Sequence, residues 1–294
     1  MTDAIDMLMR ESGLECRPFP AAPESDPAAM HWSHGAAAAR AVLDYGLAAR
    51  APLLLLTGDD GCGKTTMVHQ IAAAAPDARL AVGIVGGLRG RAGELMDFVL
   101  SAFDVPPPEG GGHVARADAF VAFLIERYAA GERTLLVVDE AHLLTDEEIE
   151  TLRALTNVNT ARDELVQVML VGGTALRARL AAPALAHVAQ RVGATAHLGA
   201  MDAAGCVGFL RARLARAGAP DDLFTDQALL AVAAASRGVP RVAGQLAELA
   251  LVIGPAPGED RIGARTVQQV VEDGLLMLPP PPAPSGGARI RLVA

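Results

Sequence analysis

The sequence predicts an α/β protein, with a three-layer α/β/α domain around a parallel sheet and a small helical domain after it. Short apolar runs bounded by Gly and Pro alternate with longer stretches rich in Ala and Leu as far as residue 199. One of these runs leads through a glycine-rich turn into a helical stretch, and after residue 199 only helical patterns remain. Strands that alternate with helices favour a parallel sheet covered on both faces.

The individual elements follow from the same patterns, in chain order. Residues 1–30 contain four prolines and predict an irregular N-terminal arm. Ser33 precedes a helical stretch over 35–50, which Pro52 ends. The strands of the sheet are expected at 53–57, 80–85, 134–138, 165–171 and 194–198. The helices between them are expected at 64–75, 91–103, 115–130, 146–157 and around Arg177.

The C-terminal third of the chain is expected to be helical, with a proline-rich end. Its helices are expected at 201–217, 225–236, 239–253 and 265–275. A run of prolines begins at residue 279 and predicts a stiff or disordered linker. We therefore expect four parts, which are the arm (1–30), the α/β core (31–199), the helical lid (200–277) and the proline-rich tail (278–294).

The composition limits the classes of function. The 294 residues correspond to roughly two domains of about 150 residues each. A net charge of −9 excludes a nucleic-acid binder that works through bulk positive charge, although it is compatible with a local basic patch on an assembled oligomer. No run of 18 apolar residues occurs, and residues 1–10 lack the basic start of a signal peptide. We therefore expect a cytosolic protein without an integral membrane segment.

The three cysteines indicate neither a disulfide nor a metal site. Cys16, Cys62 and Cys206 are far apart and lack metal-ligand spacing, which fits a reducing compartment. Cys62 lies in the glycine-rich turn, where we interpret it as a small side chain at a variable position rather than as a redox switch.

A phosphate-binding loop follows the first predicted strand. Its residues match the pattern G-x-x-x-x-G-K-[ST] and are Gly58, Asp59, Asp60, Gly61, Cys62, Gly63, Lys64, Thr65 and Thr66. Glycines let backbone N–H groups turn toward phosphate oxygens, and the helix start adds the positive end of its dipole. Lys64, the one lysine among 25 basic residues, is a compact charge that reaches the β- and γ-phosphates, a role that a planar guanidinium does not fit. The Thr65 hydroxyl is expected to bind Mg²⁺.

A pair of acidic residues follows the third predicted strand. The apolar run 135–138 leads directly into Asp139 and Glu140. In open α/β sheets, ligands bind at the edge where the strands end. We expect Asp139 to hold Mg²⁺ through water opposite Thr65, and Glu140 to act as the general base for the attacking water. A solvated acidic turn is the alternative, and the neighbouring phosphate-binding loop argues against it.

Further residues are candidates for contact with a bound nucleotide. Thr174 follows the fourth strand and either contacts a γ-phosphate or caps the helix after it. Arg191 precedes the last strand and is either an arginine finger for a neighbouring subunit or an ordinary surface arginine. Arg241 starts a helix of the lid and can reach back to the γ-phosphate. Trp32 and Phe19 are candidates for an adenine pocket.

Taken together, these motifs resemble AAA+ ATPases of the ExeA, or general secretion pathway protein A, type. Transposition ATPases of the TniB, TnsC and MuB kind are in the same neighbourhood. The resemblance covers about residues 30–275. It rests on the blocks at 56–58, 63–66, 138–141, 152–157, 170–172, 190–191 and 238–241. The later blocks are more specific to the family than the first three.

The resemblance implies a P-loop NTPase core with strand order 5-1-4-3-2 and a helical lid, with ATP and Mg²⁺ as its ligands. It also implies that Arg241 is the second sensor and Arg191 a finger candidate. Two positions differ from the family pattern. Gly173 stands where the family usually has Gln after Leu-Val-Gly, and His142 stands where Gln is common.

Three functional hypotheses follow. The first is a Mg²⁺-dependent ATPase whose nucleotide state drives homo-oligomerisation and binding of a protein partner, as in a secretion or envelope system. In the second, the partner is duplex DNA, bound by arginines of an assembled ring such as Arg177, Arg179, Arg211 and Arg213. The third is an adaptor that binds ATP but hardly hydrolyses it, which Gly173 motivates. A DEAH helicase is excluded, because 294 residues leave no room for its second sheet domain.

Overall fold

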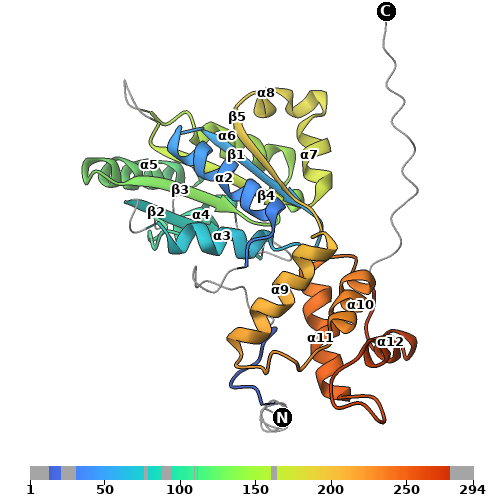
Figure 1. Cartoon of the computed structure of the whole chain (residues 1–294). Helices are drawn as coiled ribbons and strands as arrows, with labels where there is room; N and C mark the ends of the chain where they lie inside the picture. The colour runs from blue at the N-terminus through green and yellow to red at the C-terminus, as the bar shows by residue number, and fades with distance from the viewer. Residues whose placement is uncertain are drawn as a thin grey trace, which may run out of the picture.

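The computed structural model describes residues 13–20, 31–75, 79–87, 94–108, 110, 112–159 and 164–278. Within these residues the chain forms a five-stranded parallel sheet with helices on both faces, and a separate group of helices follows it (Figure 1). The strand order is β2-β3-β4-β1-β5, which is the predicted order read from the other edge. The predicted fold class is therefore confirmed.

The strands are short and largely buried. They are β1 (Leu53–Gly58), β2 (Leu80–Val85), β3 (Arg133–Val138), β4 (Val166–Gly172) and β5 (Val192–Leu198). β1 pairs with β4 and β5 and is buried along its whole length, because a central parallel strand is covered on both faces. Its four consecutive leucines alternate between the two faces of the sheet. The edge strand β5 instead alternates between buried and more exposed residues.

Different helices cover the two faces of the sheet. α2 (His34–Ala48) and α3 (Lys64–Ala73) pack on the face that contains Leu54 and Leu56. The other face contains Leu53 and is covered by a larger set of helices. These are α4 (Leu95–Ser101), α5 (His113–Ala129), α6 (Asp146–Leu155), α7 (Thr174–Leu180) and α8 (Ala186–Ala189).

Capping side chains fix several helix starts. The Ser33 hydroxyl accepts a hydrogen bond from a backbone N–H in the first turn of α2, at the start that the sequence predicts. Thr145 and Glu148 form a reciprocal capping box at the start of α6. Asp202 and Thr225 cap the first two helices of the C-terminal group in the same way.

The C-terminal helices form a core of their own, which we call the lid. They are α9 (Ala203–Arg216), α10 (Asp226–Ser236), α11 (Pro240–Ile253) and α12 (Ala264–Glu272). Figure 1 shows them grouped below the sheet, in orange and red. The arm contributes to this core, because Leu14 and Phe19 are buried among the lid side chains. The N–H of Glu15 also donates to the carbonyl of Ala217 at 2.7 Å.

Most predicted elements lie within a few residues of the observed ones. Residues 91–93 of the predicted helix 91–103 lie outside the described residues, as do 1–12, 21–30 and the tail from 279 onward. Two short elements of the described chain have no counterpart in the prediction, and they are η3 (Ala141–Leu143) and η4 (Pro183–Leu185). Each is only one turn long, so no periodic pattern marks it. Among the described residues, no helix is long and apolar enough to cross a bilayer.

Candidate functional site

The predicted phosphate-binding loop joins the end of β1 to the start of α3. Gly61 and Gly63 have φ of 81° and 97°, in the left-handed region that favours glycine. A Cβ atom at Gly61 would also lie 3.0 Å from the Cβ of Arg241, so a side chain there would crowd the start of α11. Among the described residues, no side chain caps the start of α3. The first N–H groups of this helix are therefore suited to an anion.

The Lys64 ammonium lies inside this loop. Its Nζ donates to the carbonyl oxygens of Gly58 and Asp59, each at 3.0 Å. The side chain is only 7% exposed, and the nearby carboxylate of Asp60, 3.7 Å away, is 91% exposed. A buried ammonium held mainly by neutral carbonyl groups favours an anionic ligand.

Thr65 and Asp139 meet across the edge of the sheet. The Thr65 hydroxyl donates to Oδ2 of Asp139 at 2.9 Å, although the two residues follow different strands, β1 and β3. Asp139 is nearly buried, and its Oδ1 accepts the N–H of Glu140 at 2.8 Å. Within the described residues no group of three His, Cys, Asp or Glu side chains forms a metal cage. A hydroxyl beside one carboxylate fits Mg²⁺, which commonly takes one or two protein oxygens together with substrate phosphates.

Glu140 begins a tight turn after β3. Its φ is 55°, which is rare for a residue with a side chain. The Glu140 carboxylate lies 3.3 Å from Nδ1 of His142, and Nδ1 makes no hydrogen bond within the described structure. Both side chains are partly exposed and line the same cavity as Lys64. His142 is thus next to the proposed general base, a position that the sequence did not indicate.

The cavity lies between the loop and the lid and has a volume of about 750 Å³. Lys64, Thr65 and Glu140 line it from the sheet side, and Arg241 lines it from the lid. The N–H of Arg241 donates to the carbonyl of Gly61 at 3.2 Å, so the start of α11 rests directly on the phosphate-binding loop. This volume is within the usual range of roughly 300–1,000 Å³ for small-molecule sites.

The arm and the lid supply lining residues that sequence patterns did not indicate. Trp32 and Phe19 line the cavity, as expected of candidates for a base pocket. Further lining residues that were not predicted are His31, Arg17 of the arm, and four residues of the lid, Phe209, Arg213, Gln245 and Glu248. The last two share the face of α11 that carries Arg241, because they follow it at helical spacing. This spacing is visible in the sequence, but it indicates a ligand only once the packing of α11 is known.

Of the candidate residues outside the phosphate-binding loop and the acidic pair, Thr174 and Arg191 do not line this cavity. Thr174 is the exposed first residue of α7, and Gly173 is the N-cap, so the alternative that Thr174 caps this helix is wrong. Arg191 lies just before β5, where its Nη1 is 3.5 Å from Oγ1 of Thr156. Burial raises the pKa of the Glu164 carboxylate, and the positive charge of Arg191 acts in the opposite direction. Neither Thr174 nor Arg191 is among the described residues that line the cavity.

Cys62 lies in the loop and packs into the core under α3. Burial, together with the neighbouring carboxylate of Asp59, raises the pKa of its thiol above the ordinary value. A raised pKa is the opposite of what activates a thiol for redox chemistry. The geometry agrees with the interpretation of Cys62 as a small side chain.

Comparison with known proteins places this geometry in a family. Residues 48–180 match the model of the AAA domain. General secretion pathway protein A of Aeromonas hydrophila is 33% identical over 251 residues, which cover 85% of this chain. The chain spans 45% of the length of that relative. This match confirms the resemblance to the general secretion pathway protein A type that the sequence motifs indicate.

Solved structures with the same fold come from origin-recognition proteins. The Aeropyrum pernix ORC2 protein, in ADPNP–ADP complexes, has a TM-score of 0.62 at 19% identity. The matched region covers 81% of this chain and 66% of the ORC2 chain. Drosophila ORC bound to DNA has a TM-score of 0.61 at 16% identity and covers 93% of this chain and 66% of its own. At these identities the likeness shows the fold.

Proposed function

Because the chain belongs to the AAA+ P-loop ATPases, we propose that it binds ATP and Mg²⁺ in the cavity between the sheet and the lid and hydrolyses the ATP. Its nucleotide state would then drive homo-oligomerisation and partner binding. The observation that carries the proposal is that Lys64, Thr65, Glu140 and Arg241 line one cavity although they come from distant segments. The separate buried clusters of sheet and lid support the division into a core (31–199) and a lid (200–277).

The phosphate-binding loop, Gly58 to Thr66, is the proposed site for the triphosphate. Its residues are Gly58, Asp59, Asp60, Gly61, Cys62, Gly63, Lys64, Thr65 and Thr66. Lys64 would exchange its carbonyl partners for phosphate oxygens, while the N–H groups at the start of α3 hold the phosphates in place. Thr65 and Asp139 would hold Mg²⁺, which when bound neutralises phosphate charge.

Glu140 and Arg241 are the proposed residues for catalysis and for sensing. The Glu140 carboxylate lines the cavity and would accept a proton from the attacking water. Arg241 would contact the γ-phosphate from the lid, so its contact would report the nucleotide state to α11. Thr174, at the start of α7, stays a candidate for sensing the γ-phosphate.

The experiment that tests this proposal compares three variants with the wild type in ATP binding and steady-state turnover. Lys64→Ala is expected to lose ATP binding, and Glu140→Gln is expected to bind ATP with turnover reduced about 100-fold or more. Glu147→Gln, an exposed acid on α6, is the matched control and should behave like the wild type. Unchanged binding and turnover in both Lys64→Ala and Glu140→Gln would contradict the proposal.

The proposed oligomer is tested through Arg191. A finger acts on the nucleotide of a neighbouring copy, and a position away from the residue's own cavity is compatible with that role. Arg191→Ala and Lys64→Ala subunits should each be inactive alone and should recover turnover when mixed. No recovery on mixing would contradict a finger that acts between subunits.

The contacts of the arginines suggested for DNA count against duplex DNA as the partner. Of the four arginines suggested for DNA, Arg179 pairs with Asp146 and Arg211 pairs with Asp226. A third, Arg213, lines the nucleotide cavity. We therefore propose a protein partner in the cytosol, as in a secretion or envelope system, and treat DNA as the alternative. ATP-dependent, salt-sensitive binding of duplex DNA by Glu140→Gln would reverse this preference.

The adaptor hypothesis is decided by the same turnover measurement. Gly173 has no side chain for a γ-phosphate contact, which is the observation in favour of an adaptor. Sustained multiple turnovers by the wild type would exclude it.

A further inference from the structure

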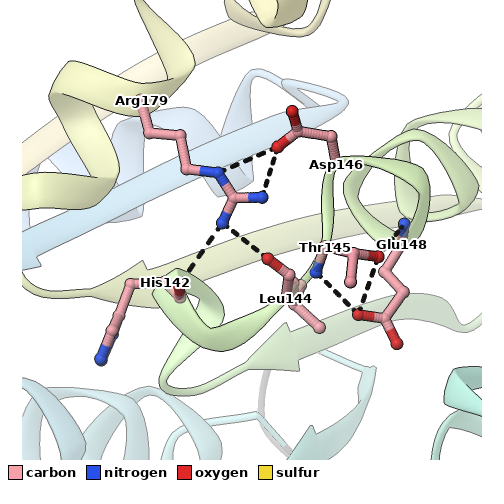
Figure 2. A network of polar contacts seen from close by, with 6 residues as sticks. All are labelled: His142, Leu144, Thr145, Asp146, Glu148 and Arg179. Atoms are coloured by element: carbon pink, nitrogen blue, oxygen red, sulfur yellow. Dashed lines mark hydrogen bonds and ion pairs between the residues drawn. The ribbon is translucent and has the colours of Figure 1, made fainter.

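One arginine from α7 holds the turn that follows β3 (Figure 2). Nη1 of Arg179 donates to the carbonyl of Leu144 at 2.6 Å and to that of His142 at 3.4 Å. Its Nε donates to Oδ1 of Asp146 at 3.0 Å, and Nη2 pairs with the same carboxylate. A single guanidinium therefore connects α7 to the turn and to the start of α6.

The planar shape of the guanidinium suits these contacts. Arg179 is partly buried, with 31% of its side chain exposed, and Leu144, whose carbonyl it contacts, is a buried residue. Guanidinium donors diverge in a fixed fork, which lets one side serve the carbonyls and the other the carboxylate of Asp146. The start of α6 is fixed independently by the capping box of Thr145 and Glu148. Arg179 therefore binds a helix start whose geometry is held by other residues.

The turn needs such support because its first residue has an unusual backbone. Glu140 has φ of 55°, a conformation that residues with side chains keep only when their surroundings impose it. Two local bonds contribute, since the N–H of Glu140 donates to Asp139 and its carbonyl accepts the N–H of Leu143 at 2.9 Å. Both bonds lie at the beginning of the turn. At its end the N–H of Leu144 donates to the carbonyl of Ala141 at 3.3 Å, and Arg179 adds the contacts of a side chain from another helix.

The contacts of Arg179 lead back to the cavity through His142. The carbonyl of His142 accepts from Arg179, and its ring lines the cavity with Nδ1 3.3 Å from Oε2 of Glu140. Arg179 itself is not among the described lining residues. Any effect of Arg179 on chemistry in the cavity must therefore pass through the turn.

We propose that Arg179 is a positioning residue for Glu140. It fixes the turn 140–144 from α7 and so keeps the Glu140 carboxylate aimed into the cavity. The inference rests on the proposed ATPase function only for what Glu140 does there. Because α7 starts directly after β4, the same contact links the end of a central strand to the orientation of the proposed general base.

The test compares Arg179→Ala and Arg179→Lys with Arg177→Ala, which removes an exposed arginine from the same helix. Arg179→Ala is expected to lower kcat about 10- to 100-fold, the effect of a displaced catalytic group, with Kd for ATP within about two-fold of wild type. Arg179→Lys should recover part of kcat, because an ammonium can reach a carbonyl but cannot fork to Asp146. Amide hydrogen exchange of residues 140–146, measured without nucleotide, should accelerate in Arg179→Ala only.

Three outcomes would overturn the inference. The first is wild-type kcat in Arg179→Ala, and the second is a reduced kcat with unchanged exchange of the turn. The third is a loss of ATP affinity as large as that of kcat, together with faster exchange throughout the core, which indicates only a structural role. If the wild type does not hydrolyse ATP, the proposed function fails. The exchange of residues 140–146 then still decides whether Arg179 holds the turn.

Discussion

The two halves of the proposed nucleotide cavity are built in different ways. The sheet side consists of short consecutive segments at strand ends, the phosphate-binding loop after β1 and Asp139 with Glu140 after β3. Backbone conformation dictates residue type there, as at Gly61 and Gly63. The lid side is assembled from the arm and from spaced residues of α9 and α11. We infer that the sheet side supplies most of the affinity for ATP and that the lid side couples ATP binding to the conformation of the lid.

The largest expected effect tests the sheet side. Lys64→Arg keeps the charge, but the loop encloses the side chain and offers it two carbonyls at 3.0 Å. We expect ATP affinity to fall about 100-fold, because a planar guanidinium does not fit a site shaped for a compact ammonium. Isothermal titration calorimetry would measure this, with Arg177→Lys as the control that should keep full affinity. A Kd for ATP within three-fold of wild type would show that the shape of the Lys64 site does not determine ATP affinity, which contradicts the role given to the sheet side.

The next effect tests the lid side. Arg241 is an exposed residue whose backbone N–H donates to the loop and whose Cβ packs beside Gly61. Arg241→Ala should therefore lower turnover about 10-fold and change ATP affinity much less. Steady-state turnover and equilibrium binding would separate the two quantities. A loss of affinity equal to that of Lys64→Arg would show that both halves act in binding.

A smaller effect concerns the arm. Phe19 is buried in the lid core and its ring lies 6.3 Å from that of Phe209, so Phe19→Ala should lower the free energy of unfolding by about 3–5 kcal/mol. Arg17→Ala removes an ion pair with Glu248 whose arginine is 47% exposed, and should lower it by less than about 1 kcal/mol. Urea unfolding would measure both. Equal effects would show that the arm does not belong to the lid core.

The smallest effect concerns the thiol inside the loop. Burial raises the pKa of Cys62, so little thiolate forms near pH 7 and the rate of alkylation should rise only as pH passes above the ordinary thiol range. Cys16 is exposed and serves as the internal control, which should react faster. Mass spectrometry after timed iodoacetamide treatment would compare the two sites. Faster labelling at Cys62 would contradict the burial argument.

The same contrast explains what the sequence could predict. The strands and the sheet-side residues were accessible, because apolar runs, glycines and the lone Lys64 are local features. The strand order followed only from the resemblance to AAA+ ATPases that these motifs indicate. The left-handed Glu140 was not, since no pattern marks a positive φ at a residue with a side chain. The N-cap of α7 was not accessible either. Hydroxyl side chains are preferred at N-caps, which favoured Thr174, but the residue at this position is Gly173.

Contacts between distant segments were equally inaccessible. Arg179 contacts the carbonyl of Leu144, in the turn after β3, although the two residues are 35 positions apart in the sequence. Arg17 reaches Glu248 across 231 positions. Only packing decides such pairs, because neither partner has a spacing that sets it apart from other surface charges.

The most direct test of the account uses Trp32, the single tryptophan of the chain, which lines the cavity. Its fluorescence should report nucleotide binding without a label. We predict a saturable change on titration with ATP and Mg²⁺ in the wild type and in Glu140→Gln, and no change in Lys64→Ala. The same response in Lys64→Ala, or no response in any of the three proteins, would contradict a nucleotide site shared by the phosphate-binding loop, the arm and the lid.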